Sequence, residues 1–349
     1  MEKLNWSPSR FGCYTQCPVK YKFTYIDGLT TYGRAFDVAT KGTCFHKIAE
    51  ETQPGESYES VYARAEKTIA EYDFDKEKYP VIKAVPVFYK WWTTYVEPLV
   101  KAGFEIHKET WKNDVIAINT PLVGAVDLYL VNKETKECYI FDYKSGGTPK
   151  MDDTYANQLT LYTYMLANEL HLEGKEITDK IHRALFYPLA DIAKIDITDD
   201  KAVEKRMLKD IVQLPLTYDE YNSKMHELIK IVETSDVKDW ASLDLLREAS
   251  VSYGCNFCEI AGSHKYCPHT ANSGVAWPKG VIVCTAEENK IAKAAEFVEN
   301  WNTDTVHTDE EIKDYEKAKK LIDNHPEIVK DMKERIRAAK NPHRVIVED

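Results

Sequence analysis

Two carboxylates and a lysine are closely spaced in a stretch of alternating sequence. Asp142 and Lys144 lie in the sequence IFDYK at residues 140–144, and Asp127 ends the sequence GAVD at residues 124–127. Alternate side chains of a strand share a face, so Asp142 and Lys144 project together. Asp127, on a neighbouring predicted strand, is placed to converge with them.

This combination of residue types suits phosphodiester chemistry. Paired carboxylates attract hard divalent cations such as Mg²⁺, which prefer oxygen ligands. Such a cation polarises a phosphate and lowers the pKa of a bound water, and a nearby lysine stabilises the charge that develops. The alternative is a surface hairpin that carries Asp-x-Lys by chance. Gly124 ahead of Asp127, and Gln158 and Tyr162 four apart on one helix face, favour the catalytic interpretation.

Hydrophobic periodicity predicts the elements that position these residues. Helices are predicted at 7–25, 42–51, 57–72 and 85–102. Four strands follow at 104–111, 115–118, 122–131 and 137–144. A helix at 152–169 and a strand at 181–189 come next, and residues 193–197 are the candidate partner strand. Further helices are predicted at 199–212, 217–234, 286–301 and 308–340.

Composition limits the class of protein. The chain has 349 residues and a formal net charge of −11, which argues against a protein that coats nucleic acid nonspecifically but allows one local DNA groove. We find no signal peptide and no apolar run long enough to cross a bilayer, so we expect a cytoplasmic protein without membrane contact. Stable disulfides are rare there, and the eight cysteines require another explanation.

The ordered set of motifs resembles the PD-(D/E)XK superfamily, specifically its RecB-like nucleases. The similar segments are SPSRF at 7–11 with Cys17-Pro18 and Tyr21, GTCFH at 42–46, GAVD at 124–127, DYKSG at 142–146, and Gln158-x-x-x-Tyr162. The resemblance implies an α/β fold with a mixed central sheet flanked by helices. We expect a nuclease core at 1–275, with a helical insertion at about 53–102, and a charged helical appendage at 276–349.

The resemblance also implies the role of each site residue. The ligands of a Mg²⁺ or Mn²⁺ ion would be His46, Asp127, Asp142 and the backbone carbonyl of Tyr143. Lys144 would assist attack by water, and Gln158 and Tyr162 would position the site and the DNA backbone. Glu109 matches an acidic residue of relatives. Without the family, a lone His46 is more typical of packing or helix capping than of metal binding.

Three cysteines have metal-ligand spacing: Cys255-x-x-Cys258, with Cys267 nine residues further on. The resemblance to the iron–sulfur exonucleases of the AddB and CRISPR-associated group implies Cys17 as the fourth ligand of a 4Fe–4S cluster. Cys13, four residues earlier, is a candidate substitute. A zinc site completed by His264 or His269 is the alternative, and inert thiols are a third interpretation.

These observations predict a metal-dependent DNA exonuclease that acts on single strands or duplex ends in recombination, repair or phage DNA processing. If the gene belongs to a phage, the protein works in the host cytoplasm. A helicase or a recombinase is the candidate partner. Two alternatives are a catalytically silent protein that binds DNA ends and a zinc-containing nucleic-acid-binding protein.

Overall fold

The structure is a computed structural model that divides the chain into two compact units. It describes residues 5–33, 37–116, 119–146, 148–249, 255, 258, 267, 282–302 and 305–340. The first unit comprises residues 1–12 and 37–238, and the second comprises residues 13–36 and 239–349. The predicted boundary near residue 275 stays a prediction.

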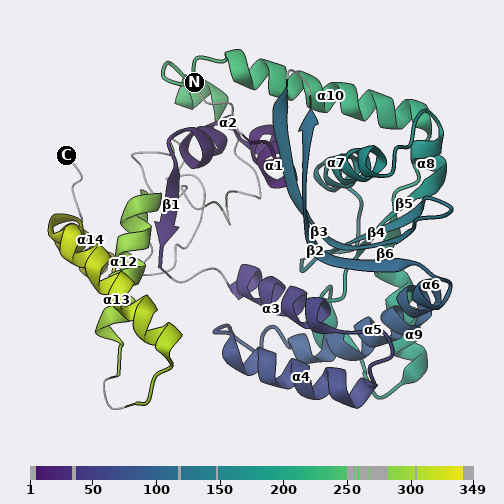
Figure 1. Ribbon diagram of the computed structural model, residues 1–349, viewed down its shortest axis with the longest axis horizontal. Helices are drawn as coiled ribbons and strands as arrows, with labels where there is room; N and C mark the ends of the chain where they lie inside the picture. The colour runs from purple at the N-terminus through teal and green to yellow at the C-terminus, as the bar shows by residue number, and fades with distance from the viewer. Residues whose placement is uncertain are drawn as a thin grey trace. The chain divides into compact units, whose positions relative to one another are not determined.

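A five-stranded mixed sheet forms the centre of the first unit (Figure 1). Its strands, in spatial order, are β2 (Glu105–Ile116), β3 (Thr120–Asn132), β4 (Glu137–Tyr143), β5 (Ile181–Phe186) and β6 (Ile211–Gln213). The β4–β5 pair is parallel and the other pairs are antiparallel. The predicted α/β fold with a mixed sheet between helices is therefore confirmed.

Helices cover both faces of this sheet (Figure 1). On one side lie α3 (Asp37–Glu51), α4 (Tyr58–Glu71), α5 (Ala84–Trp91), α6 (Glu97–Lys101) and α9 (Asp200–Lys209). On the other side lie α7 (Asp153–Glu169) and α10 (Tyr218–Val237), with the short α8 (Glu176–Lys180) beside them. The sheet is thus the middle of three layers, as its apolar strands require.

The alternation of β4 assigns its side chains to the two layers. Phe141 and Tyr143 enter a hydrophobic core that also contains Trp91 of α5 and Phe186 of β5. The Trp91 and Phe186 rings stack with centroids 4.6 Å apart. Because successive side chains of a strand point to opposite faces, Asp142 is directed toward the α7 side.

The structure corrects three predicted elements. The two strands predicted at 104–111 and 115–118 are one strand, β2, because Lys112-Asn113-Asp114 continues its pairing with β3 instead of turning. Residues 193–197 are not a strand: Ile192–Lys194 is a single 3₁₀ turn. The antiparallel partner of β5 is instead β6. The helix predicted at 199–212 ends at Lys209, before this strand begins.

The second unit contains the two-stranded sheet of β1 (Leu29–Tyr32) and β7 (Ile282–Thr285), neither of which was predicted. Its helices are α2 (Pro18–Tyr21), α11 (Leu245–Glu248), α12 (Ala286–Glu299), α13 (Asp309–Asn324) and α14 (Pro326–Lys340), and α1 (Pro8–Gln16) spans the division. The helix predicted at 308–340 is two helices that meet at Pro326, which cannot continue a helix from the preceding residues. A small core of Cys284, Ala292 and Met332 joins β7, α12 and α14.

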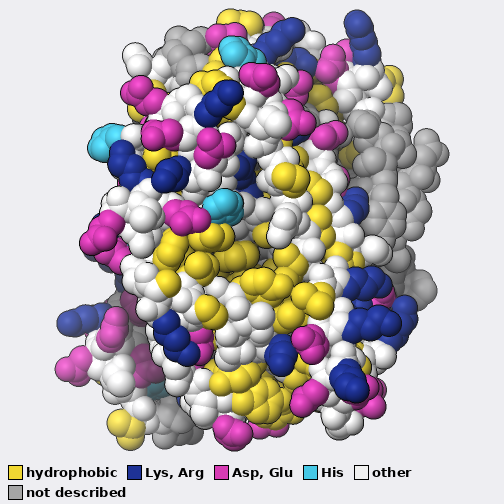
Figure 2. Space-filling model, turned by 90° about the vertical axis from the view of Figure 1, so that its right-hand side faces the viewer, with side chains coloured by type: hydrophobic (Ala, Val, Ile, Leu, Met, Phe, Trp, Pro, Cys, Tyr) yellow, Lys and Arg dark blue, Asp and Glu magenta, His cyan; other side chains and the backbone are white. Residues whose placement is uncertain are grey.

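Two further features concern membrane-spanning helices and the surface of the molecule. In the part of the chain that is described, no helix is long and apolar enough to span a bilayer. Figure 2 shows hydrophobic side chains gathered around a hollow on one face of the molecule. A cavity of about 530 Å³ lies along β5 and the segment after β6, with Tyr95, Tyr139 and Pro215 in its lining. This cavity contains none of the predicted site residues.

Candidate active site

Strands β3 and β4 separate at the point where the acidic residues stand. Their antiparallel register runs from Asn132 opposite Glu137 to Leu128 opposite Phe141. Asp127 and Asp142 come directly after this last pair. The backbone N–H of Tyr143 donates to Asp127 Oδ2 at 2.7 Å, so the carboxylate of one strand holds the backbone of the other. The two carboxylates thus stand where the strands separate, and both are buried.

A chain of polar contacts connects Asp142 to helix α7. Lys144 forms an ion pair with Asp142 and donates to Gln158 Oε1 at 2.7 Å. Gln158 Nε2 donates to Asp142 Oδ1 at 2.8 Å and to the Tyr162 hydroxyl at 3.0 Å. Tyr162 in turn donates to the carbonyl of Ala125 at 2.6 Å. Because Asp142 is only 1% exposed, these partners compensate a carboxylate that water does not reach.

Local sequence explains why α7 approaches the sheet closely enough for these contacts. Asp152 caps the helix, since its side chain accepts the N–H of Tyr155 at 3.1 Å. A methyl group added to Gly124 of β3 would lie 3.2 Å from the Tyr162 ring. Glycine at this position therefore lets the helix settle against β3, and it explains why the predicted motif has Gly124 three residues before Asp127.

The His46 side chain, on α3, approaches Asp127 from the other side of the group. Its Nδ1 lies 3.3 Å from Glu109 Oε1 and 3.7 Å from Asp127 Oδ1. Ligand atoms of His46, Glu109 and Asp127 all lie within 4.8 Å of one another, which is close enough to share one metal ion. Asp142 stands beside this group with its two oxygens directed at Lys144 and Gln158.

Glu109 is the site residue that sequence analysis did not include among the metal ligands. It stands opposite Asp127 in the β2–β3 register, between the pairs Lys108–Leu128 and Thr110–Val126. Its φ of 43° is in the left-handed region, which costs a non-glycine residue conformational energy. No residue pattern in the interior of a strand predicts a left-handed backbone conformation. The strained conformation accompanies the contact between the carboxylate and His46.

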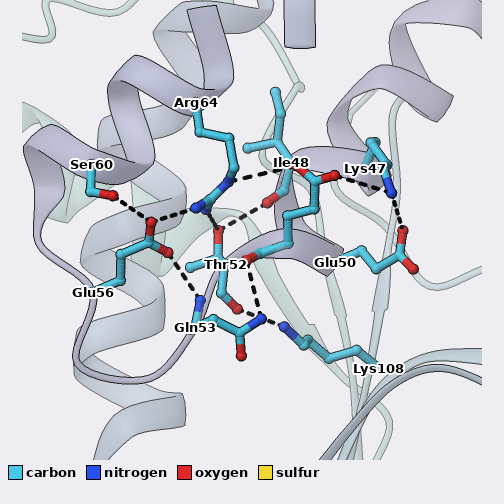
Figure 3. A network of polar contacts seen from close by, with 10 residues as sticks. Lys47, Ile48, Glu50, Thr52, Gln53, Glu56, Ser60, Arg64 and Lys108 are labelled. Atoms are coloured by element: carbon cyan, nitrogen blue, oxygen red, sulfur yellow. Dashed lines mark hydrogen bonds and ion pairs between the residues drawn. The ribbon is translucent and has the colours of Figure 1, made fainter. Parts of the chain in front are cut away.

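A polar network fixes the C-terminal end of α3 (Figure 3). Arg64 of α4 pairs with Glu56 and donates to the Thr52 hydroxyl at 3.0 Å. Lys108 of β2 donates to the Thr52 carbonyl at 2.7 Å. The network therefore ties the helix that carries His46 to the strand that carries Glu109, and it holds these two potential ligands in register.

The electrostatics of the group fit a divalent cation. Burial and the charge of Asp142 raise the pKa of Asp127 above its ordinary value. Burial alone lowers the pKa of His46, but the hydrogen bond to Glu109 and the surrounding carboxylates outweigh it and raise the pKa to about 9. Three carboxylates therefore converge on one histidine beside Lys144, and the shifted pKa values of Asp127 and His46 reflect how closely these charges interact. The carboxylates supply the oxygen ligands that Mg²⁺ and Mn²⁺ prefer, and the imidazole adds one nitrogen ligand to them.

Comparison with known proteins agrees with this geometry. The family model described as the PD-(D/E)XK nuclease superfamily matches residues 5–263. The chain belongs to the PD-(D/E)XK nuclease superfamily. No curated protein matches the sequence. The superfamily is one of nucleases that use divalent metals, so the protein is a metal-dependent nuclease. The group of His46, Glu109 and Asp127 is arranged as a metal site would be.

In this PD-(D/E)XK nuclease the cysteines predicted to bind a metal cluster all belong to the second unit. Cys17 caps α2, where its Sγ accepts the N–H of Lys20 at 3.5 Å. Cys17 and Cys258 pack against the same small cluster of Val19 and Phe23. Among the described residues, the one ligand group identified is that of His46, and it contains no cysteine. His264 and His269, the alternative zinc ligands, lie outside the described residues.

Proposed function

We propose that the protein is a RecB-like DNA exonuclease that hydrolyses phosphodiester bonds with Mg²⁺ or Mn²⁺ at the end of β4. The observation that carries the proposal is the convergence of His46, Glu109 and Asp127 beside the Asp142–Lys144 pair. Degradation of DNA ends in recombination, repair or phage DNA processing, with a helicase or recombinase as partner, is the role we assign to this activity.

Each residue has a distinct part in the proposed reaction. His46, Glu109, Asp127 and Asp142, with the Tyr143 carbonyl, would hold the metal ion. When bound, the cation withdraws charge from the scissile phosphate and lowers the pKa of a water. Lys144 keeps its positive charge, because the neighbouring Asp142 raises its pKa against the opposing effect of burial. Its ammonium group therefore orients the attacking water and stabilises negative charge on the phosphate.

Gln158 and Tyr162 act as positioning residues. The Gln158 side chain accepts from Lys144 and donates to Asp142, so a single amide sets the separation of the two charged groups. Tyr162 fixes that amide and anchors it to β3 through the Ala125 carbonyl. Because these groups are held in place before the substrate binds, less entropy is lost on the way to the transition state.

A degradation time course on end-labelled single-stranded and duplex DNA tests the function. The wild-type protein should release mononucleotides or short fragments from ends with Mg²⁺ or Mn²⁺ and none with EDTA. Asp142→Asn and Lys144→Ala should each lower the rate by at least about 10²-fold, the loss expected for a principal catalytic group. Full activity in both variants would refute the site, and cutting of closed circular DNA would refute the exonuclease mode.

We also propose that Cys17, Cys255, Cys258 and Cys267 hold a 4Fe–4S cluster with a structural role. Support comes from the ligand spacing, and from Cys17 and Cys258 packing on the same apolar cluster of the second unit. Four thiolates suit such a cluster. The link between residues 17 and 258 closes a long loop, which in the chain-entropy model stabilises the fold by about 5–6 kcal/mol.

Elemental analysis of protein purified without oxygen tests the cluster. Iron and acid-labile sulfide near four each per chain support it, and zinc without sulfide favours the alternative site. Cys258→Ser should give colourless protein with a lower melting temperature, whereas Cys138→Ser, at a buried cysteine outside the proposed ligand set, should keep the brown colour. Brown, stable Cys258→Ser protein would contradict the assignment.

A further inference from the structure

A second cavity, of about 320 Å³, lies between α3 and the segment that follows β5. This volume is at the lower end of the range of about 300–1,000 Å³ for ligand pockets. Three lysines and one carboxylate line it, together with apolar and hydroxyl groups: Lys41, Lys78, Tyr79, Val81, Thr148, Leu189, Asp191, Ile192, Ala193 and Lys194. Asp191 is already paired with Lys194 at 3.1 Å, which leaves the lining with net positive charge.

Lys41 is the unusual member of this lining. Its side chain belongs to a residue that is only 9% exposed, and burial lowers its pKa. In the described part of the chain no carboxylate forms an ion pair with it, and its ammonium group rests 4.7 Å from the centroid of the Tyr79 ring. A nearly buried cation without a counter-ion costs free energy. An anion in the cavity would remove that cost.

The cavity adjoins the nuclease site through α3. Gly42, the next residue after Lys41, packs so closely on Ser145 that an added Cβ would lie 2.7 Å from its hydroxyl oxygen. Ser145 directly follows Lys144, and Thr148 of the same segment lines the cavity. His46 is five residues after Lys41, about 7.5 Å along the helix axis at the usual rise. Because Thr148 of the cavity is only four residues after Lys144 of the metal site, a nucleic acid held at the metal site would pass within reach of the cavity.

We propose that this cavity binds a phosphate group of the DNA substrate, with Lys41 as its principal ligand and Lys78 and Lys194 at its margin. The inference rests on the proposed function for the identity of the ligand. The phosphate comes either from a strand terminus or from the backbone a short distance from the scissile bond. Both sources present the same oxygens to an ammonium group, and substrates with different ends separate them.

The experiment measures DNA binding by the full chain in EDTA, where no cleavage occurs. Fluorescein-labelled single strands carry a 5′-phosphate, a 3′-phosphate or no terminal phosphate, and anisotropy is recorded over a range of salt concentrations. The variant is Lys41→Gln. Lys47→Gln is the matched control, because Lys47 lies on the same helix but pairs with Glu50 and Glu51 at the surface. Inorganic phosphate serves as a competitor.

We expect Lys41→Gln to weaken binding by about tenfold or more, as for loss of a charge-assisted contact. The slope of log affinity against log salt should fall by about 0.7, one phosphate contact on a single strand. Inorganic phosphate should compete with DNA on the wild type and less on the variant. The melting temperature should stay unchanged or rise, because Lys41 forms no ion pair with any described residue and its charge is largely buried. Lys47→Gln should bind within about twofold of wild type.

The substrates then identify the source of the phosphate. A loss confined to a strand with one terminal phosphate assigns the cavity to that terminus, and an equal loss on all three strands assigns it to the backbone. Wild-type affinity and salt slope in Lys41→Gln on every strand would overturn the proposal. Because cleavage is not measured, Lys41-dependent binding by a protein without nuclease activity would refute the proposed catalysis and leave this site standing.

Discussion

Replacing Lys144 by methionine should destabilise the protein strongly as well as inactivate it. The Lys144 and Asp142 side chains are 13% and 2% exposed, so solvent screens their attraction weakly. Removing one partner of a buried ion pair leaves an uncompensated charge and costs about 3–5 kcal/mol. For a unit of roughly 200 residues, each kcal/mol lowers the melting temperature by about 2–4 °C. The expected decrease is therefore about 6–20 °C in metal-free buffer.

A double-mutant cycle tests whether this loss arises from the pair. Asp142→Asn, Lys144→Met and the double variant are unfolded with urea in EDTA, and their free energies of unfolding are compared. The double variant should be more stable than the sum of the single changes predicts, by about 2 kcal/mol or more, because no unpaired charge remains. All three variants should lack nuclease activity. Additivity within about 0.5 kcal/mol would refute the coupling of the two residues.

Three further changes probe the surroundings of the site. Gly42→Ala should force Ser145 to shift and lower kcat by about tenfold or more with a smaller change in KM, since about 1 Å of misplacement is costly; wild-type kcat would contradict this. Glu109→Gln removes a negative charge that helps to raise the pKa of His46 to about 9, so an NMR titration of metal-free protein should show the imidazole losing its proton at lower pH. An unchanged titration would mean that Glu109 does not influence the protonation of His46. Tyr162→Phe should lower the free energy of unfolding by about 1–3 kcal/mol and reduce kcat, while metal affinity stays near wild type. A large loss of metal affinity would mean that Tyr162 does more than position Gln158.

Much of the geometry of the candidate site was predictable because it depends on local periodicity. Alternation in β4 places Asp142 and Lys144 on one face, and the helical spacing of Gln158 and Tyr162 places both against them, as the contacts show. His46 was identified through its family motif alone, since a single histidine on a helix has no distinctive spacing. Its approach to Asp127 depends on the packing of α3 against the sheet, which is a tertiary property.

The features that escaped prediction depend on backbone strain or long-range pairing. The left-handed conformation of Glu109 directs its carboxylate to His46, and no residue pattern in a strand announces it. Strand β1 pairs with β7 across about 250 residues of sequence, and each strand is only four residues long. The burial of Lys41, which forms no ion pair with any described carboxylate, likewise cannot be predicted until the residues around it are placed together.

Anomalous scattering from a crystal of the full chain soaked in Mn²⁺ tests the central claim most directly. A peak should lie between the side chains of His46, Glu109 and Asp127, with Asp142 turned to share the ion, and Asp127→Asn crystals should lose it. A wild-type protein that degrades DNA with Mn²⁺ while its manganese peak lies elsewhere would contradict the account.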